Sequence, residues 1–137
     1  MKAQTGFEYM VILALVIAFL VPLFYMANQS IEVSRATSEA KTAVSAIVNA
    51  ANTVCVQSPG SKLTAQVFIP AGYDNRTSYV VNKTVLLTVN LADGRMYNAY
   101  GYANCNMSGR LPPYNGYHIM TFYHNQSGYA IINTTAK

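Results

Sequence analysis

The stretch Tyr9–Ala27, YMVILALVIAFLVPLFYMA, is 19 residues without a charge, and it decides the fold of the chain. Glu8 precedes it, and the next charged side chain is Glu32. As a helix rising about 1.5 Å per residue, the segment is about 28 Å long, close to the roughly 30 Å hydrocarbon core of a bilayer. We therefore expect a helix that can cross a membrane once.

A secretory signal peptide is the main alternative, because it also places a cation ahead of an apolar run. Three features disfavour it. The run is longer than the usual apolar region of roughly 7–15 residues. Tyr25-Met26-Ala27 is a poor small-x-small cleavage site, and the helical pattern continues beyond it.

The segment 28–58 continues the helix as an amphipathic half. It contains no Gly or Pro before Pro59-Gly60, and its charged residues occupy other faces than its apolar ones. The apolar positions, spaced three and four residues apart, include Ile31, Ala40, Val44, Ile47, Val48, Ala51 and Val54. We predict one helix of about 75 Å from Phe7 to Val56. Pro22 should kink or locally melt it, because proline lacks an N–H and clashes with the preceding turn.

From Lys62 onward the apolar period changes to two, which is typical of strands. Asp93-Gly94 separates two such runs and is a strong hairpin signal. The strands are expected at 62–69, 81–91, 95–100, 118–123 and 129–134. The sequence therefore predicts an α+β protein, with a long N-terminal α-helix packed on an antiparallel β-sheet in a globular head, residues 59–137.

Cys55 and Cys105 are the two cysteines of the chain. We place them near the end of the helix and in the loop after the third strand. If the head is extracytoplasmic, a disulfide between them would tie the helix to the sheet. Two buried thiols are the alternative. A metal site is not expected, because the two Cys and two His have no zinc-like spacing.

Composition disfavours catalysis and nucleic-acid binding. Only 10% of the 137 residues are charged, five of them acidic, and the net charge of +4 is scattered singly along the chain. The chain therefore has almost too few acidic residues for catalysis by a pair of carboxylates. A secreted enzyme would have to use His118 and His124, and no acid or nucleophile is recognisably placed with them. We expect neither an enzyme nor a cofactor, and no nucleic-acid partner.

The triplet Asn-x-Ser/Thr, the acceptor signal for N-linked glycans, occurs six times. Asn28 is the weakest candidate because it lies at the edge of the apolar span. Glycans would keep a surface so poor in charge solvated; unused triplets on an Asn- and Thr-rich sheet are the alternative. The candidate acceptors in the head are Asn75, Asn82, Asn106, Asn125 and Asn133.

The N-terminus carries the most specific pattern: Lys2-Ala3 precedes Gln4, and Glu8 directly precedes the apolar run. This resembles the class III signal peptide of archaeal type IV pilins. In that family a membrane-embedded prepilin peptidase cuts ahead of the Gln and leaves the apolar helix on the mature protein. The chain departs from the family's frequent Gln-x-Ser-x-Glu by having Gly6 in place of Ser.

The resemblance implies cleavage between Ala3 and Gln4. Residues 1–3 would be the leader, 4–27 the membrane-spanning and later filament-core helix, and 28–58 its amphipathic continuation. It implies a structural subunit of an adhesion pilus, with Gln4, Glu8 and Pro22 in the assembling segment. The partners would be other copies of the chain, the prepilin peptidase, and the pilus assembly platform with its ATPase.

Before assembly the subunit would lie in the archaeal cell membrane, and afterwards in a filament outside the cell. Thr5-Gly6 also resembles archaellins, the subunits of the swimming filament, which usually lack an acid where Glu8 stands. An archaellum-like filament subunit is therefore one alternative. A membrane-anchored extracellular binding or adhesion protein, crossing the membrane once, is the other.

Overall fold

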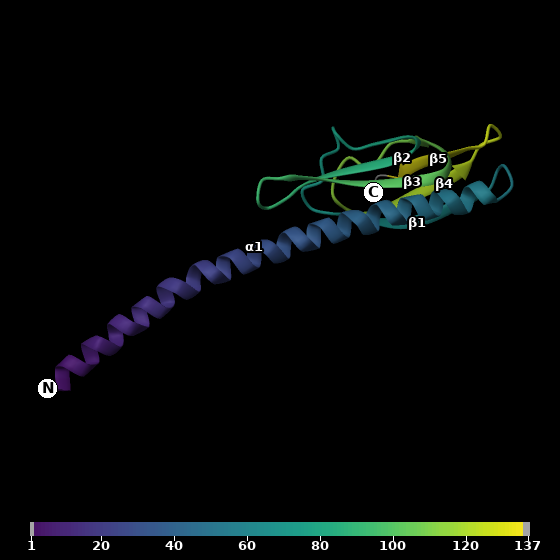
Figure 1. Ribbon diagram of the computed structural model, residues 1–137. Coiled ribbons are helices and arrows are strands. Elements are labelled where there is room, and N and C mark those ends of the chain that lie inside the picture. Colours follow the sequence, from purple (N-terminus) through teal and green to yellow (C-terminus); the bar gives the residue numbers. More distant parts are fainter. Residues whose placement is uncertain (1, 136–137) are drawn as a thin grey trace.

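One long helix and a five-stranded sheet make up the part of the chain that the computed structural model describes, residues 2–135 (Figure 1). Side chains are described for residues 6–134. The predicted α+β architecture is confirmed. In chain order the elements are α1 (Lys2–Val56), β1 (Lys62–Ile69), β2 (Tyr79–Asn90), β3 (Met96–Gly109), β4 (Gly116–His124) and β5 (Tyr129–Thr135).

Helix α1 has two halves with different surroundings. Its N-terminal half projects away from the head, and its C-terminal half lies along the sheet (Figure 1). The predicted local melting at Pro22 is wrong, because α1 continues through this residue and curves gently (Figure 1). A proline removes one N–H from the hydrogen-bond ladder, and the bonds on either side of it suffice to hold the helix.

The C-terminal half of α1 provides the helical side of the core. Its buried residues recur three and four positions apart, as an amphipathic helix requires: Ala40, Ala43, Val44, Ile47, Ala50, Ala51 and Val54. Ile31, expected on this face, is 65% exposed because the buried positions of α1 begin only at Ala40. The small alanines let the helix approach the sheet closely.

The strand order in the sheet is β1-β4-β5-β3-β2. Three neighbouring pairs are antiparallel, but β3 and β5 run parallel from Asn106↔Tyr129 to Gly109↔Ile132. The expectation of a purely antiparallel sheet is wrong in this pair. The hairpin β4–β5 is inserted between β1 and β3, so the chain crosses from β3 to β4 over residues 110–115 and returns beside β3.

Strand β3 is longer and less regular than predicted. Its register against β2 skips from Thr84↔Tyr102 to Asn82↔Met107, so four residues of β3 have no partner in β2. Asn82 adopts a left-handed backbone conformation at this irregularity, with φ of 53°. Cys105 therefore lies within β3, in the unpaired stretch, and not in a loop after the strand.

Gly101 on β3 lets the helix and the sheet meet. A Cβ atom at this position would lie 2.7 Å from Cγ2 of Val48 and closer still to Cγ1 of Val44. Both valines are β-branched and stiff at χ1, and Val44 is only 3% exposed, so neither can move aside cheaply.

We predict that Gly101→Ala lowers the free energy of unfolding by about 1–3 kcal/mol, because it overpacks this contact. Thermal unfolding of the full chain in detergent, followed by circular dichroism, measures the loss. Val44→Ala in the same background makes room for the new methyl group, so the double variant should lose less than the sum of the single variants. Strict additivity would contradict the proposed contact.

Candidate assembly surface and its anchoring in the head

The N-terminal half of α1 is an apolar surface that the chain leaves uncovered. From Phe7 to Met26, the exposed fractions of the large apolar side chains run from 44% at Val11 and Leu20 to 80% at Tyr9. By length and composition, the helix is able to cross a membrane. Fully burying one such side chain is worth about 1.5–3 kcal/mol, so the segment requires a non-aqueous environment.

This surface extends around the whole helix. Amphipathic helices of single domains have a polar face, whereas residues 9–27 contain no charged residue on any face. A helix that is apolar all round is covered on every side, either by lipid or by other helices. Both environments meet the same requirement.

Glu8 lies at the N-terminal edge of this surface and is exposed. Among residues 6–134 the ion pairs are Arg35–Glu39 and Arg95–Asp93, and neither involves Glu8. The predicted cleavage bond between Ala3 and Gln4 lies about one helical turn before Glu8, and the side chains of residues 1–5 lie outside the described part.

Pro22 lies within the apolar surface and leaves an unpaired backbone carbonyl there. Because proline has no N–H, the carbonyl of Ala18 lacks the intrahelical partner that every other interior carbonyl has. In hydrocarbon an unpaired carbonyl costs several kcal/mol unless a neighbour satisfies it. Pro22 therefore favours a neighbouring helix with a donor at this level.

At the other end, three contacts fix α1 to the head. The predicted disulfide between Cys55 and Cys105 is present, with Cα atoms 6.2 Å apart. The Asn52 side-chain oxygen accepts a hydrogen bond of 2.7 Å from the backbone N–H of Asn104. Nδ1 of His124 lies 2.8 Å from the carbonyl oxygen of Gln57, where the helix ends. These contacts hold the C-terminal end of α1 against the sheet.

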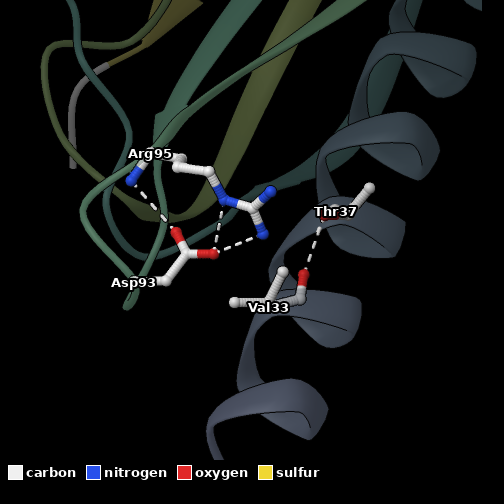
Figure 2. Close-up of polar contacts among 4 residues, drawn as sticks. All are labelled: Val33, Thr37, Asp93 and Arg95. Carbon is white, nitrogen blue, oxygen red and sulfur yellow. Dashed lines mark hydrogen bonds and ion pairs between the residues drawn. The ribbon is translucent and has the colours of Figure 1, made fainter.

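The hairpin between β2 and β3 approaches α1 at the other end of the head. Figure 2 shows its Asp93 and Arg95 beside the helical turn of Val33 and Thr37, whose side-chain hydroxyl donates to the Val33 carbonyl. Nε of Arg95 donates to the Asp93 carboxylate at 2.7 Å, and this bond holds the pKa of Asp93 below its usual range. The pair shapes the hairpin tip, while a groove next to it is lined by Glu32, Arg35 and Leu91.

The two histidines serve the fold. His118 and His124 are 6% and 8% exposed, and both lie on the helix-facing side of β4. Nε2 of His118 lies 2.9 Å from the carbonyl oxygen of Tyr114, and Nδ1 of His124 lies 2.8 Å from that of Gln57. Within the described residues, no three His, Cys, Asp or Glu side chains gather where they could hold a metal ion.

Sequence reasoning missed Asn52 and the structural role of His124. Asn52 reads as one more polar residue on the amphipathic helix, and only the fold brings it to the unpaired stretch of β3. A histidine at the end of a strand carries no signal for its partner 67 residues earlier. In contrast, the disulfide was deducible because only two cysteines are present.

The candidate glycan acceptors differ in accessibility. Asn75, Asn82 and Asn133 are exposed, whereas Asn106 and Asn125 are half-buried. Asn75 lies in the turn before β2, where its side-chain oxygen accepts a hydrogen bond of 3.3 Å from the Tyr73 hydroxyl.

Comparison of the chain with protein-family models, curated proteins and solved structures found no match.

We predict that glycan occupancy is higher at Asn75, in an exposed turn, than at the half-buried Asn106 and Asn125. If the head folds before a transferase acts, Asn75 should carry the highest occupancy, and Asn106 and Asn125 the lowest, because their side chains are partly covered by the sheet. Glycopeptide mass spectrometry of protein from the native cell surface measures each site separately. Equal occupancy at Asn75 and Asn106 would contradict the prediction.

We also predict that the disulfide stabilises the head substantially. Replacing both Cys55 and Cys105 by Ser should lower the free energy of unfolding by about 2–4 kcal/mol, since the bond closes a loop of 50 residues. Thermal unfolding in detergent measures the change. A reductant should lower the midpoint of the parent chain and leave that of the variant unmoved; equal midpoints for parent and variant without reductant would oppose the prediction.

Proposed function

We propose that the chain is the structural subunit of an archaeal type IV adhesion pilus. The observation that carries the proposal is the uncovered apolar surface of residues 7–26, continuous with a helix that is fixed to a disulfide-linked head. The N-terminal pattern from Lys2 to Glu8, which resembles that of archaeal type IV pilins, points to this class of assembly.

Assembly exchanges one non-aqueous environment for another. In the membrane, lipid covers the apolar half of α1, and in the filament sister copies cover it in a central bundle. Because lipid chains are as apolar as leucine, the exchange gains little from hydrophobicity alone. Close packing and polar contacts within the bundle, such as those at Glu8 and Pro22, therefore decide whether the filament is stable.

Glu8 is proposed to set the axial position of neighbouring subunits. Cleavage by the prepilin peptidase between Ala3 and Gln4 creates an α-amino group with a reference pKa near 8, mostly cationic at neutral pH. Glu8 of one subunit can neutralise the amino group of another when their helices are offset along the axis. A charge that is costly alone in the bilayer then marks the register.

The remaining partners follow from this route. The assembly platform and its ATPase would extract the subunit from the cell membrane, and the head would lie outside the cell. An oxidising exterior is consistent with the disulfide between Cys55 and Cys105.

We predict that Glu8→Gln leaves membrane insertion and leader cleavage intact but reduces filament number at least tenfold, because the subunit loses its register partner. Electron microscopy counts the filaments, and intact mass reports cleavage. Glu32→Gln is the matched control: it removes the next acid on α1, beyond the apolar run, and should assemble normally. Normal filaments from Glu8→Gln cells would contradict the role of Glu8.

The two alternatives differ in the state of the mature chain. A permanently anchored binding protein would keep its helix in the membrane, and would stay monomeric after extraction in detergent. An archaellum-like subunit would assemble in the same way but its loss would abolish swimming and spare attachment. Intact mass and native size of protein from the cell surface separate the first alternative from the pilus, and motility assays separate the second.

A further inference from the structure

The face of the sheet opposite α1 is covered over part of β2, where Leu86 and Thr88 are buried, but is accessible over β1 and β4 and chemically distinctive there. The side chains of β1 and β4 alternate strictly, with His118, Met120 and Phe122 buried toward α1 and their neighbours turned outward. The strand registers join Lys62, Tyr123, Ile131, Ser108 and Val81 into one row across all five strands. This row defines the distal face, the sheet surface turned away from the helix.

Aromatic and neutral polar side chains dominate the distal face around that row. Tyr117 is 72% exposed, and its ring centroid lies 4.8 Å from that of Phe68 on β1. Thr64, Thr121 and Asn133 occupy the next row toward Tyr117, according to the same registers. A shallow hollow is lined by Lys62, Thr121, Tyr123, Ile131 and Asn133. Planar rings beside hydroxyl and amide groups match the C–H faces and hydroxyl groups of sugar rings.

Two cations that belong to no ion pair among the described residues lie at the start of β1 and just after β3. Lys62 begins β1 at one edge of the sheet, and Arg110 follows two residues after Ser108. Both are exposed, and neither belongs to the ion pairs among residues 6–134. None of the distal-face residues named here is acidic. From β1 to β3 is three strand spacings, or about 14 Å, so the two cations would contact different units of an extended polymer.

The distribution of charge over the chain points in the same direction. Residues 1–58 contain Lys2, Arg35 and Lys41 against Glu8, Glu32 and Glu39, and are therefore neutral overall. Residues 59–137 contain six cations and two acids, so the whole net charge of +4 belongs to the head. A head of this sign attracts polyanions and repels other cationic surfaces.

We infer that the distal face binds carboxylated polysaccharide, with Lys62 and Arg110 contacting carboxylates and Tyr117 and Tyr123 stacking on sugar rings. Charge complementarity selects an acidic polymer over a neutral one, and the hydroxyl and amide groups select sugars over lipid. This inference deepens the proposed adhesion function. It relies on that function only for presenting many copies of the face on the outside of a filament.

The test uses the full chain in a polyoxyethylene detergent, because a glycoside detergent would compete for the same face. Polygalacturonate is the acidic probe and dextran the neutral one, and microscale thermophoresis measures the dissociation constants. Polygalacturonate should bind at low salt and weaken as ionic strength rises, while dextran should bind at least tenfold more weakly. Equal binding of both polymers, or none of the acidic one, would overturn the inference.

Variants locate the site. Lys62→Gln and Arg110→Gln should each weaken binding about two- to fivefold, as expected for exposed charge contacts, and together about tenfold. Tyr117→Ser should weaken it further at constant charge. Lys41→Gln, which removes one exposed charge from α1, should leave affinity within twofold of the parent chain. A loss for Lys41→Gln as large as that for Lys62→Gln would show charge attraction without a site.

Asn133 provides an internal check, because a glycan attached there would lie on the distal face. Protein from native cells should bind polygalacturonate as protein made without glycosylation does. If native protein binds only after Asn133→Gln, the chain's own glycan occupies the face and the inference fails. Filament counts are independent of these measurements, so failure of binding with normal assembly would leave the proposed filament role untouched.

Discussion

A helix that its own chain cannot cover is the constraint on which the structure depends. The exposed apolar side chains from Phe7 to Met26 make a water-soluble monomer unfavourable by tens of kcal/mol, at roughly 2 kcal/mol for each. The head does not cover these side chains, because its buried core includes residues of α1 only from Ala40 onward. The chain therefore leaves the apolar half of α1 without packing partners, and lipid or other helices must cover it.

Packing of the apolar helix against other helices positions the head only if the head is rigidly connected to that helix. The same α1 is both the apolar rod and one wall of the core, so no hinge separates them, and Pro22 lies outside the head. The disulfide, the Asn52 contact and the bond between His124 and Gln57 gather at the C-terminal end of α1. Because Gly101 has no side chain, β3 can approach α1 closely at Val44 and Val48. One continuous helix and these contacts therefore connect the apolar half of α1 to the head.

Local patterns sufficed for the parts of this fold that depend on neighbours in sequence. The helix end near Val56 follows from Ser58-Pro59-Gly60, and the alternation of Leu63, Ala65, Val67 and Ile69 fixes β1. The parallel pairing of β3 with β5 could not be foreseen, because strand order is decided by packing between segments far apart in the chain. The extension of β3 through Cys105 was missed for the same reason, since Ala103 to Asn106 pair with nothing in β2. Glu8 and Pro22 stand out in the sequence because charge and proline are exceptional in or beside an apolar run, and their part in assembly stays a prediction.

The separation of charge along the chain links the two halves of this architecture. A neutral helical region can be packed at high density, whereas a core of like-charged helices would repel itself over the short distances of a bundle. In the proposed filament the cationic heads would repel one another, but they would lie farther from the axis and be separated by water and counterions, so screening would reduce the cost. In the proposed filament, the positive potential of one head would be repeated at every subunit. Polymerisation would thus convert a weak attraction for anions into a strong one, because many sites would engage one long polymer at once.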